Sequence, residues 1–86
     1  MKEFTYTIND SLGIHARPAG QLVRQASDFK SRITISMEDK EADAKKILGI
    51  MSLGIRRDHK IVIRADGEDE NEAIEALSTL LKKNRF

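Results

Sequence analysis

Gly13-Ile14-His15-Ala16-Arg17-Pro18-Ala19 is the stretch in which a loop turns into a helix, and the rest of the fold is laid out from it. Proline is tolerated in the first turn of a helix, where its missing N–H has no acceptor to lose, so Pro18 places the helix start near residue 16. Apolar residues then recur at helical spacing, namely Ala16, Ala19, Leu22, Val23 and Ala26. We therefore expect a helix from residue 16 to Ser27 or Asp28, with His15 at or beside its N-cap.

Four segments alternate apolar and polar residues, which predicts strands. They are residues 2–8 with Phe4, Tyr6 and Ile8, a second with Ile33, Ile35 and Met37, a short third at 40–43 after the turn Glu38-Asp39-Lys40, and a fourth with Ile61, Ile63 and Ala65. A short helix is predicted within 45–53, ended by Gly54. A last helix follows Asp69 and Glu72, which resemble a capping box, and buries Ala73, Ile74, Leu77, Leu80 and Leu81.

The order β-α-β-β-α-β-α predicts an α+β fold, an open-faced sandwich with one four-stranded, mostly antiparallel sheet and three helices on one face. The 86 residues allow one domain, 1–86, and 40% hydrophobic residues supply its core.

No apolar run is long enough to enter a membrane, and the start of the chain is unlike a signal peptide, so we expect a cytoplasmic protein. Without cysteine, and with only His15 and His59 as histidines, we expect no metal and no cofactor.

The net charge of +1 hides an uneven distribution of charge. Six acids and no base occupy residues 66–75, whereas the bases group elsewhere, at Arg17, Arg24, Lys45, Lys46, Arg56 and Arg57. We expect a basic side and an acidic side. Near-neutral charge and 5% aromatic residues argue against a module that binds nucleic acid, because such modules need basic excess and stacking rings.

His15 is the candidate reactive residue. It precedes a helix whose first N–H groups, at Ala16 and Arg17, are free, and the helix dipole makes this end attractive to anions. The Arg17 guanidinium can bind a phosphoryl group with two hydrogen bonds. The same positive field favours a neutral, nucleophilic imidazole. These are the parts needed for phosphoryl transfer, although by spacing alone His15 fits better a residue that merely accepts a backbone hydrogen bond.

The segment 13–19, read as GIHARPA, resembles the active-site signature of the HPr family, the histidine-containing phosphocarriers of the bacterial sugar phosphotransferase system. A second signature at 46–55 (KILGIMSLGI) and the length and element order extend the resemblance to the whole chain. The resemblance implies a stoichiometric carrier rather than an enzyme. It implies that His15 accepts a phosphoryl group on Nδ1 from phosphorylated enzyme I and passes it to sugar-specific enzyme IIA, with Arg17 and the Ala16 N–H stabilising that group.

The resemblance also implies a docking surface around His15 on a monomeric protein. Its members on the first helix are Gly20, Arg24 and Ser27, and those on and beside the second are Lys46, Ile47, Leu48, Met51 and Arg56. A short helix buries only one side, so some of its apolar residues should be exposed.

Many family members carry a regulatory serine where this chain has Lys46, so we expect no control by the family's serine kinase. A regulatory relative that binds partners according to phosphorylation state without feeding sugar transport remains the alternative.

Overall fold

The computed structural model describes residues 1–86 and contains the seven elements that the sequence predicts, in the predicted order. The strands are β1 (Lys2–Thr7), β2 (Arg32–Met37), β3 (Lys40–Asp43) and β4 (Lys60–Asp66), and the helices are α1 (Ala16–Ala26), α2 (Ile47–Ser52) and α3 (Glu70–Lys83). The boundaries differ from the predicted ones by one or two residues. The fold is an α+β sandwich, as predicted.

The strands form one sheet in the order β1-β4-β2-β3, and every pairing is antiparallel. In β4, Ile63 pairs with Phe4 of β1 on one side and with Ile35 of β2 on the other. β2 and β3 form a hairpin in which Met37 pairs with Lys40. The last strand of the chain therefore lies in the middle of the sheet, next to the first.

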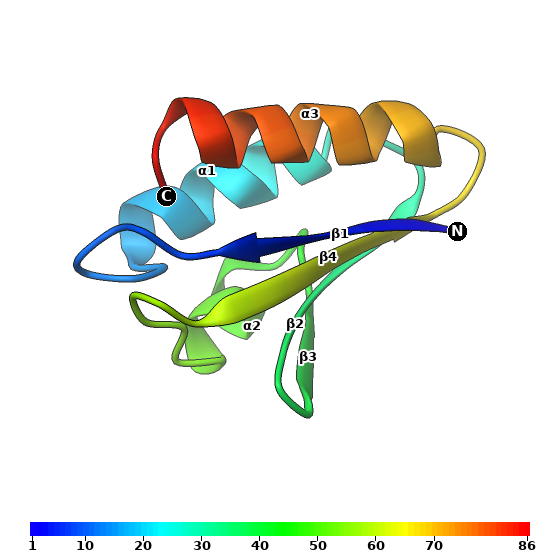
Figure 1. Cartoon of the computed structure of the whole chain (residues 1–86). Coiled ribbons are helices and arrows are strands. Elements are labelled where there is room, and N and C mark those ends of the chain that lie inside the picture. Colours follow the sequence, from blue (N-terminus) through cyan, green and yellow to red (C-terminus); the bar gives the residue numbers. More distant parts are fainter.

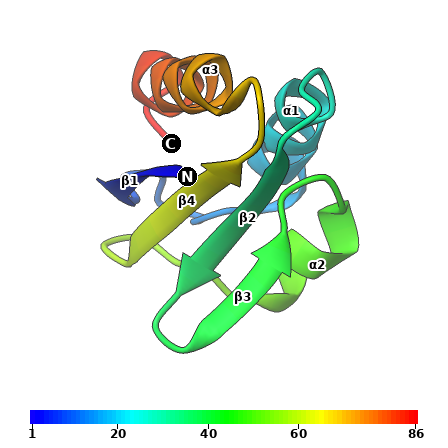
Figure 2. The same cartoon turned by 90° about the vertical axis from the view of Figure 1, so that its right-hand side faces the viewer.

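α1 and α3 lie side by side over the sheet, and α2 lies beside the β2–β3 hairpin (Figures 1 and 2). α3 contacts β1 and β4, whereas α2 contacts α1 and β3. The loop that leads from β1 into α1 lies at the end of the molecule where the chain also finishes (Figure 1). This end carries His15.

The core lies between the sheet and the helices, and it follows the predicted periodicities. Period-two alternation turns Ile33, Ile35, Ile61 and Ile63 inward, each at most 1% exposed. The helices pack against these residues with apolar side chains at helical spacing. They are Ala19, Leu22, Ala26, Ala73, Leu77 and Leu81. Each fully buried Ile or Leu side chain contributes about 1.5–3 kcal/mol through apolar burial.

One local prediction is wrong, the capping box at Asp69 and Glu72. Asp69 is the N-cap residue of α3, but its side chain makes no capping hydrogen bond. The carboxylate instead accepts hydrogen bonds from the N–H groups of Lys30 and Ser31 and from the Ser31 hydroxyl. Three donors from another segment outcompete a single N–H of its own helix, because Ser31 is buried and both its N–H and its hydroxyl need a partner.

No helix in the structure has both the length and the apolar character that crossing a bilayer requires.

Candidate functional site

His15 occupies the N-cap of α1, as predicted, but its ring does not cap the helix. Its backbone is extended, with φ −88° and ψ −169°, and its carbonyl accepts the Ala19 N–H at 3.0 Å. The imidazole makes no capping hydrogen bond, and the N–H groups of Ala16 and Arg17 donate no hydrogen bond within the protein. The side chain is 31% exposed. A half-exposed imidazole therefore lies next to two free N–H groups at the positive end of a helix, which is an arrangement suited to an anion.

Asp10 is the acidic neighbour of His15. Its Oδ2 lies 3.6 Å from His15 Nε2, a distance too long for a hydrogen bond but short enough for an ion pair with a protonated ring. Asp10 Oδ1 accepts the Leu12 N–H at 2.9 Å. This hydrogen bond, assisted by the charges of His15 and Arg17 and opposed by desolvation, lowers the pKa of the Asp10 carboxyl below its ordinary value. Because Nε2 faces Asp10, Nδ1 is the ring nitrogen left for another partner.

The loop before His15 is held from two directions. The Phe86 carbonyl oxygen accepts the N–H groups of Asn9 and Asp10, at 2.6 and 2.9 Å, and the Phe86 ring is buried. On the other side, the Ile14 N–H donates to the Ile55 carbonyl at 3.1 Å. These contacts fix the segment that brings Asp10 and His15 together.

Gly13 permits the second of these contacts. It has φ +69°, and a Cβ there would lie 2.7 Å from Arg56 Cα and closer still to the Ile55 carbonyl oxygen. Only glycine tolerates both the left-handed backbone and this close approach. The backbone of Arg56, one of the predicted docking residues, therefore packs against the loop that carries His15.

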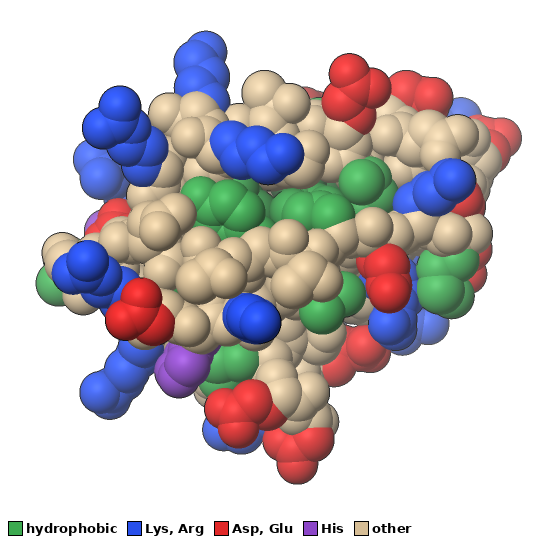
Figure 3. Space-filling view, viewed as in Figure 1, with side chains coloured by type: hydrophobic (Ala, Val, Ile, Leu, Met, Phe, Trp, Pro, Cys, Tyr) green, Lys and Arg blue, Asp and Glu red, His purple; other side chains and the backbone are tan.

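Arg17 lies two residues into the helix and is exposed, without an ion pair. Figure 3 shows Lys and Arg side chains gathered at the end of the molecule that carries the His15 loop, and Asp and Glu side chains near the start of α3.

Lys45 stands apart from the other bases, because its half-buried ammonium donates to the Phe29 carbonyl at 2.7 Å. Lys45 is therefore tied to the loop after α1, while Lys46 is exposed at the N-cap of α2.

The second helix exposes apolar side chains, as expected for a short helix on a sheet. Ile50 is fully buried, whereas Ile47, Leu48 and Met51 are 38%, 79% and 42% exposed. Gly20 of α1 faces Ile47, since a Cβ at Gly20 would lie 3.9 Å from Ile47 Cδ1. The structure thus joins these predicted docking residues on α1 and α2 across one helix contact.

Two predicted docking residues lie farther from His15. Ser27 is the C-cap of α1, and 12 residues at the helical rise place it roughly 18 Å along the axis from His15. Its hydroxyl donates to the Val23 carbonyl of its own helix at 2.7 Å. Arg24 borders a hollow between α1 and α3 together with Asp28.

His59 is a structural turn residue. Its Nδ1 accepts the Arg56 N–H at 2.9 Å, and its carbonyl accepts the Ile8 N–H. It is half-buried and closes the turn before β4.

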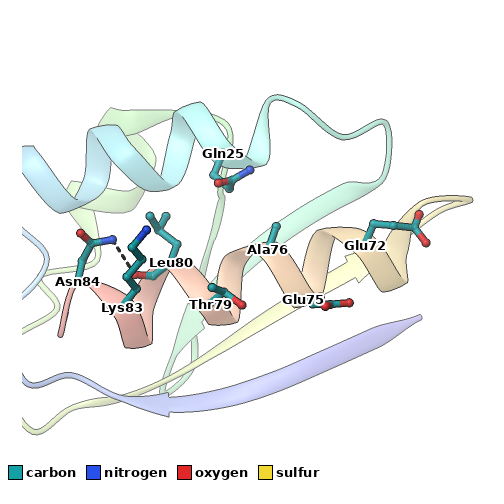
Figure 4. A pocket seen from close by; sticks show the side chains of 8 residues that line it. All are labelled: Gln25, Glu72, Glu75, Ala76, Thr79, Leu80, Lys83 and Asn84. Carbon is teal, nitrogen blue, oxygen red and sulfur yellow. Dashed lines mark hydrogen bonds between the residues drawn. The ribbon is translucent and has the colours of Figure 1, made fainter.

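The most pronounced hollow of the surface lies between α1 and α3, away from His15. Figure 4 shows its lining, which mixes acids, a lysine, amides and aliphatic groups: Gln25, Glu72, Glu75, Ala76, Thr79, Leu80, Lys83 and Asn84. Asn84 Nδ2 donates to the Leu80 carbonyl there at 2.9 Å. No histidine or free helix N-terminus contributes, so the groove lacks the chemistry found around His15.

Sequence reasoning missed three residues around His15: Asp10, Leu12 and Phe86. Leu12 is 71% exposed in the turn that Asp10 stabilises. An Asp side chain in a turn commonly accepts the N–H of the residue two positions later. The loop sequence after Asp10 was therefore a detectable signal for this hydrogen bond. Nothing in the local sequence predicts that Phe86 contacts residues 9 and 10.

Comparison with known proteins places these features in a family. Residues 2–83 match the family described as the PTS HPr component phosphorylation site. The phosphocarrier protein HPr of Lysinibacillus sphaericus is 48% identical over 81 residues, covering 94% of this chain and 92% of that protein.

Solved structures agree with this family. A structure of the histidine-containing phosphocarrier protein, solved in a study of Mycoplasma divergence from Gram-positive bacteria, superposes with a TM-score of 0.95 at 37% identity, covering 98% of this chain and 96% of that one. The structure of an HPr dimer from Thermoanaerobacter tengcongensis gives a TM-score of 0.79 at 43% identity, covering 100% and 99%. The matching family, the similar fold and the histidine at a free helix N-terminus show that the chain belongs to the HPr family of phosphocarrier proteins of the phosphotransferase system.

Proposed function

We propose that His15 accepts a phosphoryl group on Nδ1 from phosphorylated enzyme I and passes it to enzyme IIA proteins. The observation that carries this proposal is the placement of His15, whose ring stands at the N-cap of α1 without capping it. The free N–H groups of Ala16 and Arg17 remain for phosphoryl oxygens. In this role the protein is a substrate that gains and then loses a phosphoryl group, and it is not a catalyst. It would work in the cytoplasm, where phosphoenolpyruvate is made.

The transfer is a displacement at phosphorus. The Nδ1 lone pair forms the new P–N bond while the donor's P–N bond breaks, and the donor imidazole keeps that electron pair. The charge of the moving group spreads over its three oxygens, so fixed donors nearby lower the barrier. The Arg17 guanidinium is exposed and free to turn toward those oxygens.

Docking would use the apolar side chains of α2 together with the bases around them. Ile47, Leu48 and Met51 form a small exposed apolar patch, and Gly20 leaves room for Ile47. Exposed Lys46, Arg24 and Arg56 would meet acidic partner surfaces and speed association by steering. A monomer presents this surface freely, and sedimentation analysis would test that state against the dimer known for the Thermoanaerobacter relative.

The test is phosphorylation by phosphoenolpyruvate and enzyme I. We expect an acid-labile, base-stable phosphate on His15, abolished in His15→Ala and formed more slowly in Arg17→Ala at unchanged stability. His59→Ala is the matched control for an imidazole and should still be phosphorylated. Absence of phosphate with an active, cognate enzyme I would refute the proposal.

Addition of enzyme IIA tests the second half of the function. A transport carrier passes its phosphoryl group on, whereas a purely regulatory relative retains it. Loss of phosphate from His15 with its recovery on enzyme IIA is the expected result.

A further inference from the structure

We infer that Asp10 is a positioning residue for His15: its carboxylate orients the ring with Nε2–H toward Oδ2, presents Nδ1 as the nucleophile, and balances the positive charge that the ring gains when it is phosphorylated. The inference rests on the proposed function for its last part only. The orientation of the ring is a property of the free protein.

The geometry around Asp10 supports this role. Oδ2 lies 3.6 Å from His15 Nε2, and the Asp10 side chain is 19% exposed. The structure pairs the ring with no other carboxylate. In apo proteins such contacts are often long and shorten when charge develops on the ring.

Asp10 is also held firmly, which a positioning group requires. Its N–H donates to the Phe86 carbonyl at 2.9 Å, its carbonyl accepts the Gly13 N–H at 2.8 Å, and its Oδ1 accepts the Leu12 N–H. Oδ1 is the oxygen that binds Leu12, and Oδ2 is the oxygen that lies toward the His15 ring. Each of the two carboxylate oxygens therefore has a separate task.

The other groups at the site make a counter-charge necessary. Arg17 on α1 and the free N–H groups at the start of that helix make this side of the site positive. They favour the incoming phosphoryl oxygens but oppose a cationic ring. When Nδ1 forms the P–N bond, the ring keeps its Nε2–H and becomes a phosphoimidazolium. When the group is passed on, the P–N bond breaks and its electron pair returns to the ring. Asp10 faces the nitrogen that carries the proton throughout.

Asp10→Asn separates this role from the role of Asp10 in its turn. The amide oxygen can still accept the Leu12 N–H, so the loop keeps its shape, while an NH2 group replaces Oδ2 opposite the ring. A donor facing Nε2 favours the opposite tautomer. Glu68→Gln is the matched control, because it removes the same charge at an exposed site by the start of α3, at the other end of the molecule.

The first measurement is a long-range ¹⁵N–¹H spectrum of the labelled protein without partners. In the wild type and in Glu68→Gln we expect the neutral ring of His15 to carry its proton on Nε2. In Asp10→Asn we expect a shift toward the Nδ1–H tautomer, with backbone amide signals outside residues 9–17 unchanged. A wild-type ring protonated on Nδ1, or the same tautomer in Asp10→Asn, would overturn the inference. This result does not depend on enzyme I, so it stands apart from a failure of phosphoryl transfer.

The second measurement is the pH profile of phosphate loss from phosphorylated His15. The cationic ring is the better leaving group, so losing the counter-charge should move the midpoint of the profile down by about half to one pH unit, which makes the loss about two- to fivefold slower at the wild-type midpoint. Glu68→Gln should reproduce the wild-type profile. Superimposable profiles for the wild type and Asp10→Asn would refute the charge-balancing part.

Discussion

Asp69 binds Ser31 across the molecule instead of capping the helix that it begins. Its Oδ1 accepts both the N–H of Ser31, at 2.9 Å, and the Ser31 hydroxyl, and its Oδ2 accepts the Lys30 N–H at 2.8 Å. Ser31 is 1% exposed, and Gly67 has no Cβ that would collide with it. One carboxylate thus ties the start of α3 to the segment that enters β2.

This contact predicts how stability depends on pH. The hydrogen bond from the Ser31 hydroxyl is the main cause that lowers the pKa of Asp69 from 3.8 to about 2, joined by the N–H of Lys30. A lowered folded-state pKa adds stability that is complete above the unfolded value and is lost as the pH falls toward the folded value. We expect Asp69→Ala to be less stable than the wild type at pH 7, and the difference to shrink between about pH 4 and pH 2. Urea unfolding across this range measures it.

Glu68→Gln is the control for that series, since Glu68 is exposed and pairs only with exposed Lys30. Its stability should follow the wild type at every pH. A constant gap between Asp69→Ala and the wild type down to pH 2 would contradict the assignment of the titration to Asp69.

Gly13→Ala tests the close approach between the His15 loop and residues 55–56. The new Cβ meets the Ile55 and Arg56 backbone in a left-handed conformation, so we expect a loss of about 2–4 kcal/mol in the free energy of unfolding. Gly54→Ala is a matched control with φ +67° and open space around its Cβ, and should lose only about 1 kcal/mol. Chemical denaturation compares them, and equal losses would show that backbone conformation alone matters at Gly13.

Leu48→Ala tests the docking surface without disturbing the core. Leu48 is 79% exposed, so we expect its stability to change by no more than about 0.5 kcal/mol. If the side chain docks, its removal should weaken binding to enzyme I by about 1–2 kcal/mol, or five- to thirtyfold. Calorimetric titration with enzyme I measures this. Thr79→Ala, on the exposed side of α3, should bind like the wild type.

Because residue 46 is a lysine, we expect the family's serine kinase to leave this protein unmodified. A lysine cannot accept the phosphoryl group, and it places a positive charge where phosphoserine would place about −1.5 to −2. Mass spectrometry after incubation with the kinase and ATP should find no phosphoserine in the wild type. Lys46→Ser should acquire a phosphate, since residue 46 is exposed at the N-cap of α2. Stoichiometric phosphate on a serine of the wild type would contradict the prediction.

Periodicity in the sequence was enough to predict the fold, because burial enforces it. The alternation of Ile33 and Ile35 or of Ile61 and Ile63 has one solution in a sheet with a single covered face, and Pro18 could stand only in a first turn. The element order then leaves few topologies. Gly54 ended α2 as expected, with φ +67°.

Contacts between distant segments explain what the sequence could not predict. Asp69 satisfies the local pattern of a cap, but its donors lie 38 and 39 residues earlier in the chain. The contact of Phe86 with Asn9 and Asp10 is equally remote. The position of His15 was predictable from its own neighbours, whereas the orientation of its ring depends on the loop that these remote contacts hold.

The strand order has a consequence for synthesis on the ribosome. β4 lies between β1 and β2, so neither of the two earlier neighbours can complete its pairing until residues 60–66 have left the exit tunnel. Non-local pairing of this kind delays folding until most of the chain is available. His15 is translated early, yet the contacts that hold its loop come from Ile55 and Phe86, which are translated much later. A nascent chain therefore exposes His15 before the segments that hold its loop have been synthesised.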